Sequence, residues 1–244
     1  MAKLRFDPTK SLDFTDPLEV PTYSIKEAAH YLHMPSATLR DWLLGCPYRI
    51  KHGTERRRTS PLIDLADKEA KLLSFINLAE AHVLGAFRRT HGVPLKQIRQ
   101  ALDFVVAKHG WSHPLVEEEF ATDGISMFVD HLGQLVDASA KGQVVMRAML
   151  IAHLQRLERN EHGVFRLYPF TRPNLPDSNP MSVFIDPKIA FGRPVLATVR
   201  IPTASLVERY LAGEAIEELA RDYDCQTLDI QEAIRAEWQL ESAA

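Results

Sequence analysis

The spacing of apolar residues divides the chain into short helices and a few strands. Ser24 and Glu27 have the spacing of a capping box, in which the Ser hydroxyl accepts a backbone amide and the Glu carboxylate reaches back. Apolar residues follow at helical spacing over 25–32, and again over 39–43 in a second helix for which Ser36 is the predicted cap. Two short helices separated by about three residues predict a helix-turn-helix.

A hairpin is predicted directly after these two helices. Residues 48–59 alternate loosely between polar and apolar side chains around Gly53, and their second half carries three consecutive arginines. We interpret this segment as a β-hairpin wing with a basic far strand.

The middle of the chain mixes helical and hairpin patterns. Apolar periodicity predicts a long amphipathic helix over 65–89 and another over 95–106. Asp123-Gly124 is a two-residue turn signal, so we expect a small antiparallel meander over 120–136. A strongly apolar helix is expected over 141–159, followed by a strand over 164–168.

Four prolines between positions 169 and 180 exclude a regular element there and indicate an extended linker. Beyond the linker the pattern predicts a short strand over 183–185. Three short helices follow, and the last two could form a second helix-turn-helix. Their predicted ranges are 203–213, 215–223 and 228–238.

The sequence therefore predicts a mainly α fold with small β elements. It joins an N-terminal winged helix-turn-helix, a helical and β-hairpin middle region, and a C-terminal trihelical, helix-turn-helix-like domain. The expected units are an arm (1–20), the DNA-binding region with its middle part (21–168), the linker (169–180) and the C-terminal domain (181–244).

Charge is distributed unevenly along the 244 residues, whose net charge is −3. Residues 21–60 contain seven Lys or Arg against three Asp or Glu, whereas residues 181–244 contain six against eleven. Since a nucleic-acid surface should be locally basic, only the first segment fits one. The acidic C-terminal segment is better suited to a basic protein partner.

The predicted helix-turn-helix would present the start of its second helix to the major groove of double-stranded DNA. Arg40 suits guanine or phosphate, and the hairpin arginines suit the backbone or the minor groove, although such residues are often only a solvated face. The candidate DNA contacts are Ser36, Thr38, Arg40 and Asp41 of the helix and Lys51, Arg56, Arg57 and Arg58 of the hairpin.

The string YSIKEAAHYLHMPSATLRDWL resembles the start of MerR-like regulators and excisionase-type proteins, and HGVPLKQIRQAL resembles their later helix behind the wing. The usual Gly-Tyr-Arg wing tip is absent, so the resemblance does not establish whether the wing contacts DNA. The metal-binding cysteines and long coiled-coil helix of MerR metal sensors are absent too.

The C-terminal stretch resembles the antitoxin-associated domain of unknown function 433. Its matching motifs are Asp186-Pro187, Phe191-Gly192-Arg193-Pro194-Val195 and Arg200-Ile201-Pro202. Thr198-Val199 stand where that family usually has Gly-Thr. Arg193 and Arg200 flank a short strand that is predicted between Pro194 and Pro202. There they would either pair with acids of the following helices or contact a partner.

Taken together, the chain resembles the longer VapB-type antitoxins. The resemblance implies a homodimeric autorepressor of its own promoter that also neutralises a cognate PIN-like ribonuclease toxin. The alternative is a standalone MerR-like transcription regulator whose middle region senses a small ligand. The predicted helices over 72–87 and 144–157 are candidate dimer interfaces, or else internal core.

No catalytic constellation, cofactor motif or metal-ligand spacing stands out, so we expect neither an enzyme nor a metalloprotein. Cys46 and Cys225 suit small core residues. Because no apolar run is long enough for a membrane span or a signal peptide, we expect a cytoplasmic protein without membrane contacts.

Overall fold

The computed structural model describes residues 16–49, 56–89, 93–172 and 179–238. Helices dominate these residues, and their strands pair antiparallel as β1·β4, β2·β3, β5·β6 and β7·β8. This confirms the mainly α class with small β elements. The elements are β1 (Tyr23–Ser24), α1 (Ile25–Tyr31), α2 (Ser36–Leu44), β2 (Pro47–Arg49), β3 (Arg56–Arg58), β4 (Leu72–Leu73), α3 (Phe75–Arg89), α4 (Leu95–His109), the π-helical turn η1 (Phe120–Gly124), α5 (Ile125–Leu135), α6 (Ala140–Leu154), β5 (Leu157–Asn160), β6 (Gly163–Leu167), β7 (Val183–Phe184), the 3-10 turn η3 (Ala190–Gly192), β8 (Val195–Leu196), α7 (Thr203–Leu211), α8 (Ile216–Asp222) and α9 (Thr227–Glu237).

The predicted helix-turn-helix is confirmed in α1 and α2. The Ser24 hydroxyl accepts the amide of Glu27 at 3.2 Å, and the Glu27 carboxylate accepts the amide of Ser24 at 2.9 Å, which completes the capping box. Leu39, Trp42 and Leu43 of α2 are buried, as are the two alanines of α1. The apolar spacing along the chain was therefore sufficient to find this pair of helices.

Ser36 is not the cap of α2, as the sequence pattern had suggested. Pro35 occupies the N-cap position with a φ of −62°, no side chain caps the helix there, and Ser36 is its first residue. The proline ring fixes φ near the value that the chain needs on entering the helix, so the start of α2 is set by backbone geometry and not by a capping side chain.

The predicted long helix over 65–89 is also wrong in its first part, because α3 begins only at Phe75. Before it, the Asp67 carboxylate accepts two amides of a turn, and β4 pairs with β1. The Ser74 hydroxyl then accepts the amide of Asn77 at 3.2 Å and opens the helix. Pairing with a distant strand thus prevails over the local apolar periodicity.

The predicted antiparallel meander over 120–136 is wrong as well, since this segment is helical through η1 and α5. Apolar residues at helical spacing are buried here, and Asp123-Gly124, which suggested a hairpin turn, lies within the π-helical turn η1. The position of a Cβ on Gly124 would lie 2.9 Å from the Phe120 ring, so the residue's small size allows close packing within the helix. The buried residues include Phe120, Ile125, Phe128, Val129 and Leu132.

The helix predicted over 141–159 ends earlier, at Leu154, and the chain then forms the β5–β6 hairpin. Gly163, the first residue of β6 after the turn, has a φ of 102°, a conformation that favours glycine. The strand predicted over 164–168 is confirmed by β6, and the strand and three helices predicted after the linker are confirmed by β7, α7, α8 and α9.

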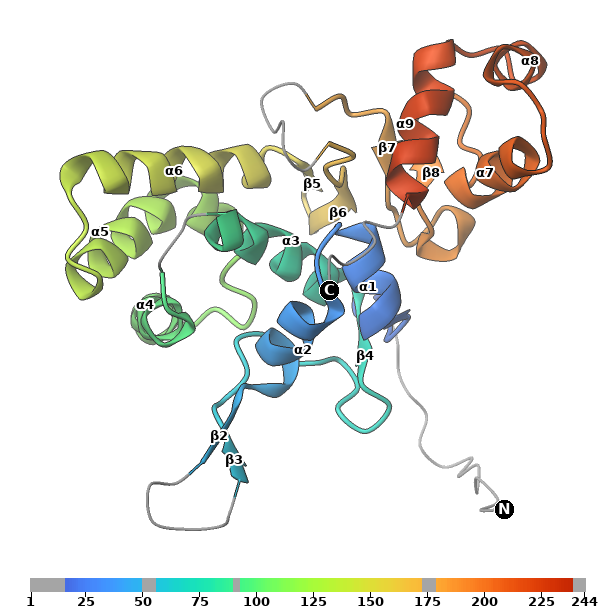
Figure 1. Cartoon of the computed structure of the whole chain (residues 1–244). Helices are drawn as coiled ribbons and strands as arrows, with labels where there is room; N and C mark the ends of the chain where they lie inside the picture. The colour runs from blue at the N-terminus through green and yellow to red at the C-terminus, as the bar shows by residue number, and fades with distance from the viewer. Residues whose placement is uncertain (1–15, 50–55, 90–92, 173–178, 239–244) are drawn as a thin grey trace, which may run out of the picture.

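The buried apolar residues form two clusters. The larger extends from Leu18 to Ile185 and includes the helix-turn-helix with α3–α6, and the smaller lies among β7, β8 and α7–α9. In Figure 1 the C-terminal helices sit at one end, next to α1, while the β2–β3 hairpin projects from the opposite end. The domain boundaries expected from sequence remain a proposal.

Part of the predicted linker, 173–178, lies outside the described residues. Both flanks of it are held by one buried arginine, Arg156. Its guanidinium donates to the carbonyls of Tyr168, Pro169, Asn179 and Pro180 at 2.8 to 3.1 Å. Burial lowers the pKa of Arg156 to about 10, and the four carbonyl acceptors compensate for the lost hydration.

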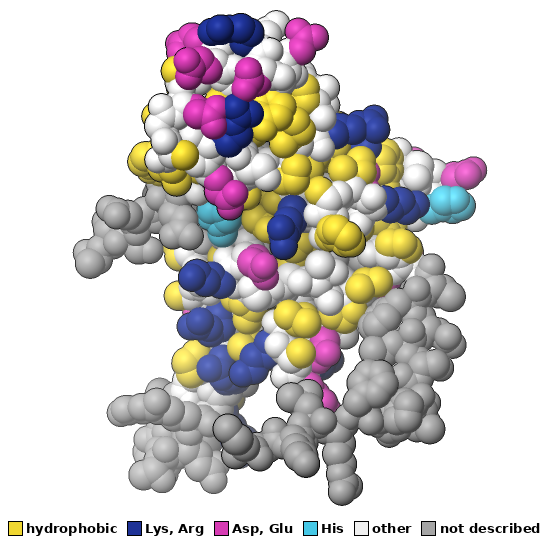
Figure 2. Space-filling model, turned by 90° about the vertical axis from the view of Figure 1, so that its right-hand side faces the viewer, with side chains coloured by type: hydrophobic (Ala, Val, Ile, Leu, Met, Phe, Trp, Pro, Cys, Tyr) yellow, Lys and Arg dark blue, Asp and Glu magenta, His cyan; other side chains and the backbone are white. Residues whose placement is uncertain are grey.

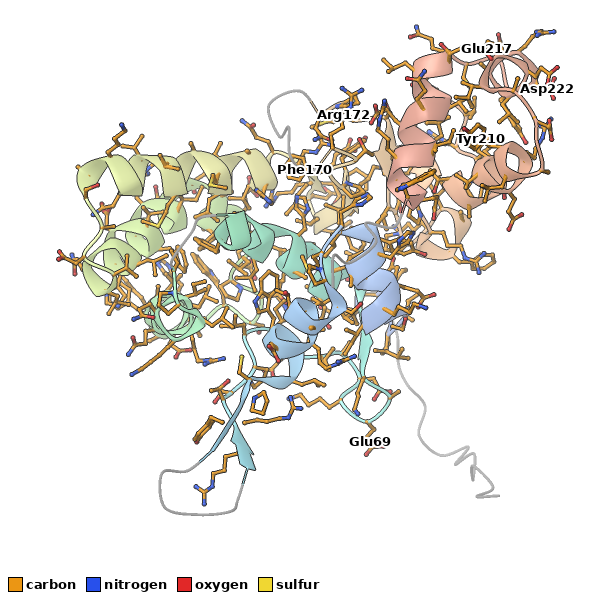
Figure 3. All side chains as sticks on the ribbon, viewed as in Figure 1. Glu69, Phe170, Arg172, Tyr210, Glu217 and Asp222 are labelled. Atoms are coloured by element: carbon orange, nitrogen blue, oxygen red, sulfur yellow. The ribbon has the colours of Figure 1, made fainter. Side chains whose placement is uncertain are left out.

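Two carboxylates connect helix α9 to α1 and to the segment after β6. Glu237 accepts from Nε2 of His30 on α1 at 3.0 Å and from the hydroxyl of Thr203. Glu232, which is fully buried, is hydrogen-bonded to Thr171 and Arg172. Figure 3 shows Arg172 next to α9, between the helical body and the C-terminal helices.

The contacts of Glu237 make the stability of the fold depend on pH. Burial alone would raise its pKa, but the hydrogen bonds from His30 and Thr203 outweigh burial, and the pKa lies below the ordinary value of 4.5. The ionised carboxylate therefore stabilises the fold above about pH 4.5, and this contribution is lost as the pH falls through the lowered pKa. We expect Glu237→Gln to lower the free energy of unfolding by about 1–3 kcal/mol at neutral pH.

Denaturant unfolding measured from about pH 7 down to about pH 3 checks this expectation. The difference between wild type and Glu237→Gln should shrink as the pH falls. Glu161→Gln, which changes an exposed carboxylate, is the matched control and should follow the wild type. A constant difference at every pH would contradict the assignment.

Candidate nucleic-acid interface

Helix α2 separates a buried face from an exposed one. Leu39, Trp42 and Leu43 point into the core, whereas Arg40 is exposed and Ser36 and Thr38 are half-buried. Of the predicted DNA contacts on α2, Arg40 is exposed, whereas Ser36 and Thr38 lie at the two edges of the buried face. An exposed guanidinium near the start of a second helix has the chemistry to bind phosphate or guanine.

The predicted hairpin is confirmed for its two described strands. Pro47 pairs with Arg58, Tyr48 with Arg57 and Arg49 with Arg56. Tyr48, Arg57 and Arg58 are exposed. Lys51 and the rest of the predicted tip, 50–55, lie outside the described residues, and for Arg56 the backbone alone is described.

Helix α2 and the hairpin are joined at Gly45. This residue has a φ of 75°, and a Cβ there would lie 1.8 Å from the carbonyl oxygen of Thr59. The Cys46 amide donates to the Thr59 hydroxyl at 3.0 Å, and the Thr59 amide donates to the Cys46 carbonyl at 3.0 Å. The close approach requires glycine and sets the position of the hairpin relative to α2.

Two arginines add to this joint, one from the hairpin and one from α4. Arg58 donates through Nη1 to the carbonyl of Gly45 at 2.8 Å, so part of its guanidinium serves the fold. Arg99 donates to the carbonyl of Ser60, where the chain leaves the hairpin. The sequence reasoning did not single out Arg99, although the basic pair Lys96 and Arg99 on one helix turn of the segment expected behind the wing was a usable signal.

Asp41 lies beside the thiol of Cys46 at the base of the hairpin. Burial, and then the neighbouring Asp41 carboxylate, raise the pKa of that thiol. The thiol is accordingly kept protonated, and Asp41 has a partner within the protein in addition to its position on α2. A carboxylate in this place would also repel DNA phosphates that approached from its own side.

Charged side chains of opposite sign collect at opposite ends of the molecule. Figure 2 shows Lys and Arg side chains gathered toward the hairpin end, and Asp and Glu side chains gathered on the C-terminal helices. Glu217 and Asp222 lie at the far end from the hairpin in Figure 3. DNA phosphates would therefore be attracted to the hairpin end, where α2 also exposes Arg40.

Arg193 and Arg200, the predicted partner contacts, are both exposed and are separated by β8. Arg193 directly follows η3 and is close enough to Tyr31 of α1 to lower the pKa of its hydroxyl, although burial dominates and raises that pKa to about 12. Arg200 lies in the turn between β8 and α7 with a φ of 56°. Among the ion pairs formed by described residues, none joins either arginine to an acid of the following helices.

No group of His, Cys, Asp or Glu in the described ranges has the arrangement of a metal site. Within the same ranges, no helix combines the length and apolar character needed to cross a membrane. Both cysteines are free.

Two families match this chain in separate regions. Residues 21–102 match the family described as "Putative DNA-binding HTH domain", which covers α1, α2, the hairpin, α3 and part of α4. Residues 183–235 match "Protein of unknown function (DUF433)", which covers β7 to α9. The second match confirms the C-terminal resemblance.

The "Putative antitoxin VapB45" of Mycobacterium tuberculosis is 27% identical over 234 residues, which cover 89% of this chain and 94% of that protein. A crystal structure of Rv2018 from the same organism has the same fold, with a TM-score of 0.60 and 24% identity over 88% of this chain and 98% of that one. The chain is thus homologous over most of its length to a protein named as an antitoxin, with a DNA-binding helix-turn-helix region on its N-terminal side and a DUF433 region on its C-terminal side.

Proposed function

We propose that the protein is the cytoplasmic antitoxin of a type II toxin–antitoxin system. It binds its own promoter as an autorepressor and neutralises a PIN-like ribonuclease encoded beside it. The observation that carries the proposal is the combination, in one chain, of a helix-turn-helix with an exposed basic face and an acidic C-terminal unit on the opposite end. The homologue named as an antitoxin supports the same role.

DNA binding would use α2 and the hairpin together. On α2, Arg40 would contact DNA from the exposed face, with Ser36 and Thr38 at the edges of that face, and the joint at Gly45 holds the hairpin in one orientation to the helix. A fixed angle between the two elements lets α2 contact base edges while the hairpin contacts the backbone. The wing residues Lys51, Arg56, Arg57 and Arg58 are proposed for those backbone contacts, and Asp41 for the rim of the interface.

A homodimer would place two such modules on a two-fold operator. Of the two helices considered from sequence, α3 is internal, since Leu78, Ala79, Val83 and Leu84 are at most 1% exposed. Helix α6 leaves Val144, Val145 and Ile151 exposed, Val144 at 66%. The polar residues Lys141 and Arg147 lie on the same helix. An exposed apolar strip of this kind is suited to being covered, which makes α6 the candidate interface.

The exposed strip of α6 is also self-complementary. In an antiparallel pair with a two-fold axis at Ala148, Val144 faces Ala152 of the other copy, and Val145 faces Ile151. Val144 then packs against a small side chain, and Val145 and Ile151 pack side by side. The small Ala148 at the axis allows the two helices to approach closely.

The alternative, a standalone regulator, shares the DNA-binding half of this proposal and differs in its partner. It would release promoter DNA when a small ligand binds the middle region, and it would need no toxin. Both proposals describe a regulator and not an enzyme, in keeping with the DNA-binding family matched by residues 21–102.

Arg40→Ala should weaken binding to the protein's own promoter by about 1–3 kcal/mol without loss of folded structure. The lost contact is a charge-assisted one, so the slope of log affinity against log salt concentration should fall by about 1. Fluorescence anisotropy with labelled promoter DNA measures both. Arg221→Ala removes an exposed arginine of α8 as the matched control, and equal affinities for the two variants would remove Arg40 from the interface.

Co-expression with the product of the adjacent gene tests the antitoxin role. Expression of that gene alone should arrest growth with cleavage of cellular RNA, and co-expression of this chain should restore growth through a stable complex. Growth that is unaffected by the adjacent gene, together with promoter release by a cell metabolite extract, would favour the standalone regulator.

Val144→Glu should convert the dimer to a monomer, because it places two charges, one from each copy, within an apolar contact. Light scattering after size-exclusion chromatography gives the mass directly. Leu228→Glu, an equivalent change at an exposed leucine of α9, should leave the dimer intact. A wild-type chain that is monomeric at high concentration would argue against self-association through α6.

A further inference from the structure

The turn η3 presents a phenylalanine to solvent in a backbone conformation that such residues avoid. Phe191 is 90% exposed, the largest exposed fraction among the large apolar residues that the structure describes. Ala190, Phe191 and Gly192 have consecutive φ values of 50°, 56° and 73°, all in the left-handed region. For a bulky side chain this is a strained conformation, and such strain persists only where the surroundings enforce it.

The residues before Phe191 are held in place from both sides. The Asp186 carboxylate accepts the amide of Lys188 at 3.0 Å and is bridged by Arg166 of β6 at 3.2 Å. The Ile189 amide donates to the Asp186 carbonyl, and the Gly192 amide donates to the Ile189 carbonyl. The chain is therefore a tight series of turns anchored to the larger cluster.

The residues after Phe191 are held as firmly. A Cβ on Gly192 would lie 2.2 Å from the hydroxyl oxygen of Tyr23, so the backbone rests directly on the helix-turn-helix region. The carbonyl of Pro194 accepts the amide of Thr203 at 3.0 Å. The surroundings thus fix the whole loop, while the Phe191 ring itself remains almost fully in water.

The charge beside the ring is basic in a region that is otherwise acidic. Lys188 and Arg193, on either side of Phe191, are both exposed. An aromatic anchor flanked by cations fits a protein surface with an apolar pocket rimmed by carboxylates. DNA fits less well, because the carboxylates gathered on the adjoining C-terminal helices repel phosphate.

We infer that the loop from Asp186 to Pro194 is the docking element for the protein encoded by the adjacent gene, with Phe191 as the residue that enters its pocket. This inference rests on the proposed antitoxin function and adds to it the anchor and the chemistry of the partner surface. A fixed loop loses little conformational freedom on binding, so a single ring can contribute strongly to affinity.

The test measures binding of the purified adjacent-gene product to the full chain and its variants by biolayer interferometry. Phe191→Ala should weaken binding about tenfold or more, as expected for a buried aromatic anchor. Arg193→Glu, which reverses a flanking charge, should also weaken it. Leu211→Ala removes another strongly exposed apolar side chain, 73% exposed, and should bind as the wild type does.

If Phe191 had a purely structural role, both Phe191→Ala and Phe191→Gly would lower the melting temperature. We expect neither to do so. The ring of Phe191 packs against little, so Phe191→Ala should keep the wild-type melting temperature, and glycine suits the left-handed backbone, so Phe191→Gly should not lower it. A clear loss of melting temperature in both variants would overturn the inference.

The remaining outcomes separate this inference from the proposed function. If the wild type binds the adjacent-gene product and Phe191→Ala binds it equally well, the anchor is wrong and the antitoxin function stands. If the wild type does not bind it, both fail. A loss of promoter affinity, or a change from dimer to monomer, in Phe191→Ala would assign the ring to DNA or to a second copy and would also overturn the inference.

Discussion

The pairing of two carboxylates on α9, Glu232 fully buried and Glu237 half-buried, is the constraint on which the arrangement of this protein depends. Glu232 is enclosed and paired with Thr171 and Arg172, and Glu237 is paired with Thr203 and with His30 of α1. A buried charge is tolerated only with its partners in place, so any other position of α9 would leave carboxylates without compensation. The C-terminal helices are for this reason tied to the helix-turn-helix directly, and not only through the chain between them.

The same principle, a close contact that permits a single arrangement, recurs at both surfaces proposed for function. At the hairpin end, Gly45 brings the end of α2 against the carbonyl of Thr59 and fixes the hairpin. Near the C-terminal helices, Gly192 lies against the hydroxyl of Tyr23 and fixes the loop that exposes Phe191. Each glycine allows an approach that a Cβ would block, and each places a basic or aromatic side chain outward on a rigid support.

The contacts at Gly45 and Gly192 involve the helix-turn-helix and the strand just before it, respectively. Tyr23 precedes α1 and contacts the η3 loop, while α1 packs on α2 and carries His30 toward α9. A partner held at Phe191 would thus sit one packed layer away from the helix proposed to meet DNA. The acidic C-terminal helices would repel DNA phosphates and favour their approach at the basic hairpin end.

The sequence by itself determined the helix-turn-helix, the hairpin strands, the three C-terminal helices and the basic segment, because capping residues, apolar spacing and local charge act within a few positions. It did not determine the helical state of 120–136, the strand at Leu72–Leu73, the contact of Arg99 with Ser60 or the exposure of Phe191. Asp123-Gly124 favours a turn locally, yet burial of Phe120 and Phe128 on one helical face prevails. These outcomes depend on contacts between residues that are far apart in the chain. Only the tertiary structure brings those residues together, so only the tertiary structure could decide them.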